Sequence, residues 1–433
     1  MVLRGKVLRC IGLLIVLLAG GCDQHDPRRG DVNYGLGSVN FDDLYSYQSD
    51  GPYSNVLKRC AAIRFAFESC TLNTLPLLGQ ERAAPSVSDV MNRLAVSHAW
   101  MGDNFRLVLE SMPDDVLLLL RSVTAIVIDA DIKPAFYDPT TGAIYLDPDF
   151  LWLTVAERAM LPSRSDFREN YGRDLQFVDL WRYVRNNDWA WSSPDPADNI
   201  DRTLTEIRLP FARLLYHELA HANDMAPVDL IATFSGATTI YQAINAIGPQ
   251  WLSTQLIASY PLYSDALKQI AQVKFNGQSS TAEQRAYSPA DVGSLFQSDG
   301  ADMLYNYTTP HEDFALLFEE TMMKYHFDAE LDVAFTNNPA GEQLSCDDYQ
   351  VAWGQRNRIA SPLVTPRAQN VATQLLPDTD WSTFFSSGVG TTIQMPAGGW
   401  CENLVQGSAA VASRSRRVTA PMVMPEENLR PPH

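Results

Sequence analysis

One segment restricts the fold more than any other, because it carries two histidines one helical turn apart in apolar surroundings. Residues 204–223 have the composition of a strong helix and contain His217, Glu218 and His221. Side chains four residues apart lie on the same face of a helix, so both imidazoles can reach one tetrahedral metal ion. Glu218 is displaced around the helix and can contact a water on that ion without binding the ion itself. We therefore predict a metal site that a second element of the chain completes.

The alternative is a surface helix on which two histidines and a solvated glutamate have no chemical role. The chain has only seven histidines, so a chance match to this spacing is rare. Leu215, Leu219 and Ala220 surround the motif and leave it uncharged, as expected for a buried active-site helix. We therefore favour the metal site over the surface helix.

The segment from Leu214 to Asp224 resembles the active-site helix of the zincin metallopeptidases. The resemblance implies that the two histidines bind Zn²⁺ and that Glu218 is the catalytic carboxylate in the hydrolysis of a peptide bond. One departure is Asn223, where these families usually place an apolar residue. Another is Pro227, which stands where the extended motif has a third histidine, so the third ligand must come from elsewhere.

A second segment supplies the candidate for the third ligand. Glu312, Ala315 and Phe318 match the pattern with which the lethal-factor-like group of gluzincins provides a glutamate ligand. The resemblance therefore implies that Glu312 completes the zinc site. That group also places a tyrosine seven residues before the ligand, near the reacting carbonyl, and this position is Tyr305 here, with Tyr307 close by.

Other roles for these residues stay open at the level of the sequence. Thr309, Pro310 and Glu312 also form a capping box, in which the glutamate has only a structural role. Glu319, two turns further along the same face of the predicted helix, is the alternative ligand. His311 is either a further contact of the site or a polar residue at the start of the helix.

Asp224 follows His221 by about one helical turn and also has two interpretations. Metal-bound histidines usually donate their other N–H group to a carboxylate or a carbonyl, and Asp224 can be that carboxylate. It can equally be an exposed residue in the turn after the helix.

The beginning of the chain is predicted to be a signal peptide rather than part of the fold. A basic start is followed by the short apolar run Ile11–Ala19 and by two glycines before Cys22. These glycines and the cysteine resemble the bacterial lipobox, in which the cysteine is lipidated; the alternative is an ordinary signal peptide with an incidental cysteine. The resemblance implies a lipid-anchored protein of the bacterial cell envelope that faces the periplasm. Asp23 favours the inner membrane weakly over the outer one.

Four further cysteines agree with export to an oxidising compartment. They are Cys60, Cys70, Cys346 and Cys401, and we predict disulfides between the pairs that are nearest in sequence, 60 with 70 and 346 with 401. The alternative is a four-cysteine metal site, which would need a short C-x-x-C spacing that these cysteines lack.

The charge of the chain restricts its partners. A net charge of −18 repels the phosphates of nucleic acids, which argues against nucleic acid as a partner. The expected partners are a peptide or protein substrate and, through a lipid at Cys22, a membrane.

The remaining patterns predict an α+β fold, because strands precede the helices instead of alternating with them. The core is expected to be zincin-like, with an N-terminal mixed sheet and hairpin, the active-site helix and a mainly helical C-terminal part. By the resemblance, the hairpin 135–147 is the edge along which the substrate lies. Helices are predicted at 88–111, 113–120, 176–187, 204–223, about 310–326, and in parts of 226–300. Strands are predicted at 125–128, 135–137 and 143–146.

Composition divides the chain into parts with different expected roles. Segments that are small and polar, without a helical period, are expected to be a tether and a disordered tail. The predicted parts are a lipoprotein signal peptide at 1–21, a tether at 22–50, a metallopeptidase domain at 51–406 and a disordered tail at 407–433.

Taken together, the resemblances imply a zinc-dependent peptidase of the bacterial cell envelope. One alternative is a non-catalytic envelope lipoprotein with a structural zinc ion. Glu218 argues against it, because a structural site is closed by four protein ligands and needs no general base. The other alternative is a metallohydrolase that acts on a non-peptide bond of the envelope, and the sequence leaves it open.

Overall fold

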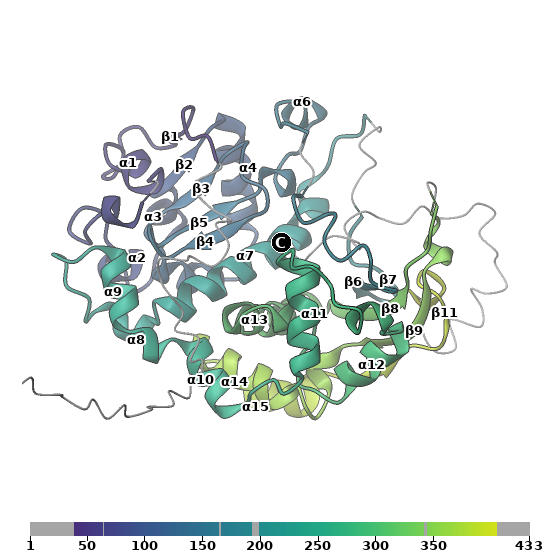
Figure 1. The fold of residues 1–433 in the computed structure, drawn as a ribbon. Helices are drawn as coiled ribbons and strands as arrows, with labels where there is room; N and C mark the ends of the chain where they lie inside the picture. The colour runs from purple at the N-terminus through teal and green to yellow at the C-terminus, as the bar shows by residue number, and fades with distance from the viewer. Residues whose placement is uncertain (1–38, 64, 164–165, 193–198, 342–343, 405–433) are drawn as a thin grey trace, which may run out of the picture. The chain divides into compact units, whose positions relative to one another are not determined.

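Figure 1 shows the fold of the protein in a computed structural model. The structure describes residues 39–63, 65–163, 166–192, 199–341 and 344–404. The predicted signal peptide, Cys22 and the predicted tail therefore lie outside the described residues. The described part combines helices with two β-sheets, which is compatible with the predicted α+β class. Within it, no helix is both long enough and apolar enough to cross a membrane.

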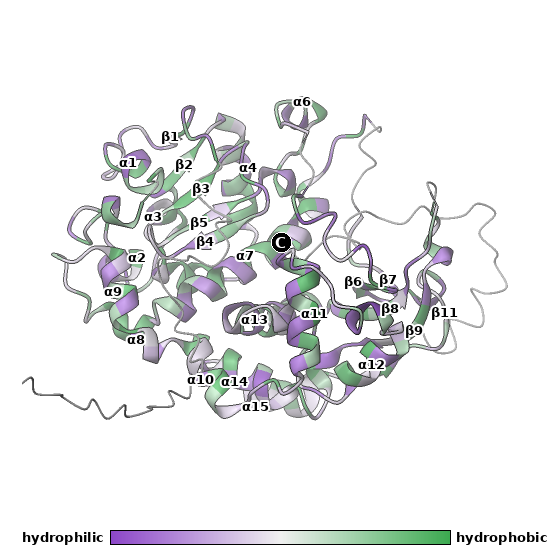
Figure 2. Cartoon of the chain, viewed as in Figure 1, coloured by the Kyte–Doolittle hydropathy of each residue, from purple (hydrophilic) through white to green (hydrophobic). Residues whose placement is uncertain are grey.

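The first sheet has a parallel centre and antiparallel edges. Strands β2, β3 and β5 run parallel, and β1 and β4 pair antiparallel at the two edges, in the order β1-β2-β3-β5-β4. Figure 2 shows β2 and β3 as hydrophobic, in agreement with their complete burial. The predicted strand and the predicted hairpin are confirmed. The strands are β1 (Tyr45–Ser46), β2 (Leu94–Val96), β3 (Ile126–Ile128), β4 (Phe136–Asp138) and β5 (Ala143–Leu146).

The prediction of one helix over 88–111 is wrong, because β2 interrupts it. The structure has α3 (Val87–Met91) before this strand and α4 (Ala99–Glu110) after it. β2 lies between β1 and β3 and is buried throughout. A short apolar run that is buried on both faces has no polar alternation, so its pattern does not distinguish it from a segment of buried helix.

The beginning of the described chain packs onto the first sheet. Phe41 and Leu44 are buried in one hydrophobic cluster with helix α1 (Leu57–Ala61), and β1 pairs with β2. The prediction of a tether over 22–50 is therefore wrong for residues 39–50, which belong to the folded domain. Two buried apolar side chains in a polar segment are a weak sequence signal, and their burial depends on contacts with distant residues.

The second sheet is antiparallel and combines strands from before and after the central helices. Its order is β10-β9-β8-β6-β7, with β11 also paired to β9. The predicted helix at 176–187 is wrong, because most of it forms strand β6. The C-terminal part also contains more strands than predicted. The strands are β6 (Phe177–Arg185), β7 (Asp188–Trp189), β8 (Glu330–Asn337), β9 (Gln350–Arg356), β10 (Ile393–Gln394) and β11 (Gly398–Gly399).

The pattern of β6 is misleading because both of its faces are buried. On one face, Arg182 Nε donates to Asp332 Oδ2 at 2.8 Å, and both side chains are buried. On the other face, the guanidinium of Arg213 lies 5.0 Å from the ring of Trp181. Buried charges among apolar residues remove the strand alternation. The Phe, Val, Trp and Tyr content of this segment is nevertheless typical of strands.

Two long helices, α7 (Leu204–Met225) and α13 (Pro310–Phe327), pack against each other. α7 also contacts β4 and β5 of the first sheet, whereas α13 contacts β8 of the second sheet. In the interface between the two helices, the rings of Tyr216 and Phe318 meet edge to face, with centroids 6.1 Å apart. Both predicted helices are confirmed, and they connect the two sheets through one hydrophobic core.

Shorter helices complete the described chain. The helix predicted at 113–120 is confirmed as α5, and the segment at 226–300 is helical in parts, as predicted. Both predicted disulfides, Cys60–Cys70 and Cys346–Cys401, are present. The helices not yet named are α2 (Leu78–Glu81), α5 (Asp115–Leu119), α6 (Val155–Arg158), α8 (Val228–Ile231), α9 (Ile240–Ala246), α10 (Leu252–Ser259), α11 (Asp265–Phe275), α12 (Pro289–Gln297), α14 (Thr365–Leu375) and α15 (Trp381–Thr383).

Two carboxyl groups, Asp302 and Glu320 of α13, are buried beside each other with almost no exposed surface. Burial raises the pKa of Asp302 to about 6 and raises that of Glu320 well above its ordinary value, and the neighbouring Asp302 adds to the second shift. Glu320 therefore keeps a proton in the folded protein at a pH at which the unfolded chain has lost it. Folding then takes up a proton, so this group makes the protein less stable as the pH rises.

Glu320→Gln should remove this pH dependence, because the amide has a similar shape and cannot ionise. The variant should be more stable than the wild type at pH 8 by at least about 1 kcal/mol, and this difference should shrink towards pH 5. Thermal unfolding of both proteins across this pH range measures the difference. The control is Glu110→Gln, which changes an exposed glutamate, and its stability should depend on pH as that of the wild type does. If the stability of the wild type and that of Glu320→Gln change in parallel with pH, the raised pKa assigned to Glu320 is wrong.

Candidate metal centre

Helix α7 is built so that its histidines lie in the protein interior. Thr203 caps its start, where Thr203 Oγ1 accepts from the backbone N–H of Glu206 and the Glu206 carboxylate accepts from the N–H of Thr203. Almost every residue from Leu209 to Asp224 is buried. The polar Asn223 is accommodated because its side-chain amide donates to the carbonyls of Leu119 and Leu219, each at 2.8 Å. Its departure from the zincin pattern therefore has a structural explanation.

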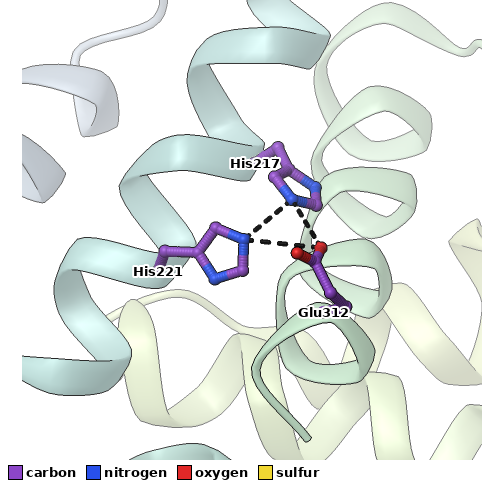
Figure 3. A group of neighbouring side chains, drawn as sticks. All are labelled: His217, His221 and Glu312. Atoms are coloured by element: carbon purple, nitrogen blue, oxygen red, sulfur yellow. Dashed lines mark hydrogen bonds and ion pairs between the residues drawn. The ribbon is translucent and has the colours of Figure 1, made fainter. Parts of the chain in front are cut away.

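Three side chains from α7 and α13 converge on one point (Figure 3). Nε2 of His217 lies 2.9 Å from Nε2 of His221, and Oε2 of Glu312 lies 3.2 Å from the first nitrogen and 3.5 Å from the second. Bonds of about 2.0–2.1 Å to a tetrahedral zinc ion place neighbouring ligand atoms about 3.3 Å apart. The three atoms therefore have the separation that one metal ion requires, and this group could hold such an ion.

Glu312 reaches the histidines from the first turn of α13. Its backbone N–H donates to Thr309 Oγ1 at 3.1 Å, which confirms Thr309 as the N-cap residue. The carboxylate of Glu312 points to the two imidazoles rather than closing a capping box (Figure 3). Although burial opposes the change, His221 and His217 hold the pKa of Glu312 below its usual range. The side chain is therefore an ionised carboxylate, which suits a metal ligand.

Glu319 contacts the opposite side of the same histidine. Its Oε2 lies 3.2 Å from Nδ1 of His217, and the hydroxyl of Tyr183 donates to its Oε1 at 2.9 Å. Nη1 of Arg213 lies 3.5 Å from the same carboxylate, and all four side chains are buried. The geometry thus brings Glu312, and not the alternative Glu319, to the nitrogen that faces His221. A carboxylate on the second nitrogen of a ligand histidine fixes the orientation of its ring.

The two imidazoles differ in their electrostatic surroundings. Burial is the largest effect on His217 and lowers its pKa, but contacts with Glu312 and Glu319 prevail and raise the pKa to about 9. Burial lowers the pKa of His221. With two carboxylates on opposite sides of His217, the site therefore strongly favours positive charge at this position.

Glu218 lies next to this group and is almost completely buried. Its Oε2 has no hydrogen-bond partner among the described residues. Burial raises the pKa of Glu218 to about 8; His217 opposes this shift, and Glu312 adds to it. A buried carboxylate oxygen without a partner is costly, and a cation or a water held in the same space would satisfy it. The donor set of two imidazoles and one carboxylate, with a further carboxylate beside it, therefore fits a zinc ion with an open position.

The structure places the two candidate tyrosines in different surroundings, although both lie in the short turn that precedes α13. The hydroxyl of Tyr305 accepts from Nη1 of Arg168 at 3.4 Å, and its ring meets Phe275 edge to face. Burial and the nearby Asp299 raise the pKa of Tyr307. The hydroxyl of Tyr305 is thus held by an arginine, whereas that of Tyr307 has no hydrogen-bond partner among the described residues.

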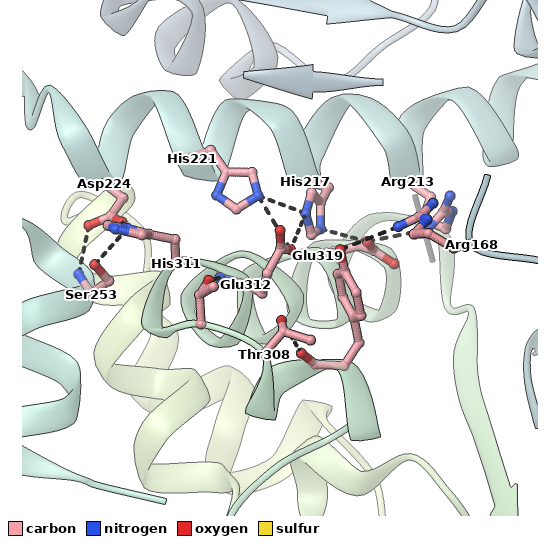
Figure 4. A network of polar contacts seen from close by, with 12 residues as sticks. Arg168, Arg213, His217, His221, Asp224, Ser253, Thr308, His311, Glu312 and Glu319 are labelled. Carbon is pink, nitrogen blue, oxygen red and sulfur yellow. Dashed lines mark hydrogen bonds and ion pairs between the residues drawn. The ribbon is translucent and has the colours of Figure 1, made fainter. Parts of the chain in front are cut away.

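Asp224 and His311 form a second pair at the other end of the site (Figure 4). Oδ2 of Asp224 lies 2.6 Å from Nδ1 of His311, and its Oδ1 accepts from the backbone N–H of Ser253 at 2.7 Å. Asp224 therefore pairs with His311 and not with a histidine of the metal group. These contacts join α7, α10 and the start of α13, which holds the residue next to Glu312 in place.

Sequence analysis did not identify Arg213, Tyr183 or Arg168 as parts of this region. Arg213 had a usable signal, because it lies four residues before His217 on the same helix and so shares its face. Tyr183 and Arg168 had none, because they reach the site from segments that are distant in the sequence.

Comparison with protein families, with curated proteins and with solved structures finds no match to this chain.

Substitutions should separate the ligands from the surrounding residues. His217→Ala, His221→Ala and Glu312→Ala should each abolish tight zinc binding, because each removes one of three converging donors. Glu319→Gln should retain binding but weaken it about 10–100-fold, because it only alters the support of His217. Zinc titration with a competing chelator measures both effects.

Thr309→Ala is the matched control on the same turn as Glu312. It should lower stability by about 0.5–2 kcal/mol and leave zinc affinity unchanged. Normal zinc binding by Glu312→Ala would show that this glutamate is only a structural residue of the helix start.

Proposed function

We propose that the protein is a zinc-dependent peptidase of the bacterial cell envelope with a zincin-like catalytic core. The observation that supports this proposal is the buried Glu218 carboxylate, whose Oε2 has no partner among the described residues, beside a convergent group of only three donors. A structural zinc site is closed by four protein ligands and needs no free carboxylate. An open position next to a carboxylate is instead the arrangement of a hydrolytic site.

In the proposed reaction, Glu218 transfers the protons. When bound, zinc supplies a Lewis acid that acidifies water and polarises the carbonyl of the substrate. Glu218 removes a proton from the attacking water and delivers it to the nitrogen of the leaving amine. Its burial supports this role, because a poorly solvated carboxylate binds a proton more readily than an exposed one. Glu319 contacts the second nitrogen of His217 and thereby supports the orientation of its ring.

Tyr305 is proposed to stabilise the negative charge that develops on the carbonyl oxygen. Its hydroxyl oxygen accepts a hydrogen bond from Arg168, which holds the hydroxyl group in a defined position. Arg168 is itself fixed by Asp166, whose oxygens lie 2.6 and 2.9 Å from Nη2 and Nε of the guanidinium. A donor in a fixed position is effective in a buried site, because little reorganisation is needed as charge develops.

The outer strand β4 is proposed to bind the substrate. It is the edge of the first sheet, and it contacts α7, which carries the two histidines. An extended peptide can add to the edge of a sheet through main-chain hydrogen bonds, which are independent of its sequence. This arrangement favours peptide or protein substrates over small molecules.

We also propose that a lipid at Cys22 anchors the protein to the membrane, with the inner membrane weakly favoured. The lipobox-like sequence supports this proposal, and the two disulfides agree with an oxidising compartment. Detergent should then be required to release the mature protein, and release by high salt alone would contradict the anchor.

Glu218→Gln tests the proposed reaction directly. The variant should keep its fold and its zinc, while turnover of a peptide library should fall by several orders of magnitude because both proton transfers are lost. Glu206→Gln on the same helix is the matched control, since glutamine also closes a capping box, and it should retain activity. Wild-type turnover in a pure Glu218→Gln preparation would mean that another group is the base. A zinc-loaded wild type that cleaves no peptide would contradict the peptidase assignment.

A further inference from the structure

Two phenylalanines project from the surface in a loop that is closed by a disulfide. Phe65 is 57% exposed and Phe67 is 84% exposed, and the second value is the highest for any large hydrophobic residue in the described chain. Their rings stack with centroids 5.3 Å apart and an angle of 7° between the planes. Exposing two aromatic rings to water is unfavourable, so a pair of this kind indicates a surface that becomes covered.

The loop around these rings is held from both ends. Cys60 and Cys70 are joined and buried, and the side chain of Ile63 is buried with them. The backbone N–H of Phe65 donates to the carboxylate of Glu68 at 3.0 Å, which stabilises the turn that carries both rings. The disulfide and this hydrogen bond therefore restrict the conformations of the turn that carries the rings, which lowers the entropy lost when they are covered.

The same part of the domain receives the chain from its N-terminal side. The first described residue, Val39, and Phe41 belong to the hydrophobic cluster that contains Ile63 and the disulfide. Lys58 on α1 donates to the carbonyl of Asp42 at 2.6 Å, so the helix before the loop lies against the entering chain. Figure 1 shows α1 and β1 side by side at this end of the chain.

The length of chain upstream restricts the distance from the proposed lipid. Residues 23–38 connect Cys22 to the described domain, and even a fully extended chain of this length spans no more than roughly 60 Å. A lipid at Cys22 would therefore keep the point where the chain enters the domain within this distance of the bilayer. A membrane surface is then within reach of this loop.

We infer that Phe65 and Phe67 insert into the interfacial region of the lipid bilayer and orient the domain on the membrane. The orientation argument rests on the proposed lipid anchor, whereas insertion itself requires only the two exposed rings. Aromatic side chains are favoured at the boundary between headgroups and hydrocarbon. Insertion is apolar rather than electrostatic, because the sequence of this region balances its charges. The basic residues Lys58, Arg59 and Arg64 are matched in number by the acidic residues Asp42, Asp43 and Glu68.

The charge balance distinguishes this contact from binding of a basic patch to anionic lipid. Attraction to anionic headgroups falls steeply with salt, whereas burial of apolar side chains does not. The contact should therefore form on vesicles of the zwitterionic lipid phosphatidylcholine, and it should persist in high salt.

Photochemical labelling tests the inference in the mature full-length protein mixed with phosphatidylcholine vesicles. A photoreactive phenylalanine analogue replaces Phe67 in one preparation and Tyr263, which is 77% exposed outside this loop, in the other. Adducts with phospholipid should form at position 67 with a yield at least about tenfold above that at position 263, because only position 67 lies in the proposed contact with the bilayer interface. Phe65→Ser in the same chain should lower the yield at position 67 several-fold.

The possible results distinguish insertion of the two rings from anchoring by a lipid at Cys22 and from binding of another protein. Equal lipid labelling at positions 67 and 263 would overturn the inference, as would labelling that disappears in high salt. In cells, protein adducts at position 67 without lipid adducts would also overturn it and would assign the loop to a protein interface. Release of the protein by salt alone would refute the anchor at Cys22, while lipid adducts at position 67 would still support insertion. Unchanged thermal unfolding of the substituted proteins confirms that the fold is intact.

Discussion

The packing of α13 on α7 is the interaction on which the candidate centre depends. α7 contributes two imidazoles one turn apart, and α13 contributes two carboxylates two turns apart, so each helix presents one pair on one face. His217 lies between the carboxylates, with Glu312 3.2 Å from Nε2 and Glu319 3.2 Å from Nδ1. Neither helix could form this arrangement alone. The large apolar interface between the helices supplies the stability that holds these charged groups out of water.

The electrostatic balance of the centre depends on the same packing. Glu218, Glu312 and Glu319 lie around one histidine, and Arg213 is a permanent positive charge beside them. Three carboxylates in a buried volume repel one another, and the desolvation of each adds to the cost. A divalent cation between His217, His221 and Glu312 would offset this repulsion. The fold therefore provides a site in which either protons or a bound metal ion can balance the carboxylates.

The sequence predicted those parts of the structure that depend on local patterns. The helices around His217 and Glu312, the hairpin of β4 and β5, and both disulfides follow from spacing, turn residues and cysteine number. Prediction from the sequence failed for strands that are buried on both faces, because such strands lack the alternation of polar and apolar residues. β2 was hidden within a predicted helix, and the buried Arg182 in β6 removed the strand alternation.

The same limit applies to the candidate site. The convergence of Glu312 with the histidines was predictable from a short motif, whereas the choice between Glu312 and Glu319 required the geometry, since both lie on one face of α13. For Asp224, the sequence suggested a role that the structure does not support. Its position suggested support for a metal ligand, but the fold brings His311 closer. Long-range partners of this kind are set by tertiary packing, which leaves no periodic signal in the sequence.

The separation of the three donors along the chain has a consequence for when the candidate metal site can assemble. Helices α8 to α12 lie between the histidines and Glu312, so the donors meet only after this long segment has folded and the two central helices have docked. A polypeptide that crosses a membrane in an unfolded state therefore carries no assembled centre. For a protease, this delay would protect both the nascent chain and its neighbours during export. If the protein has the proposed function, activity would begin only after folding is complete.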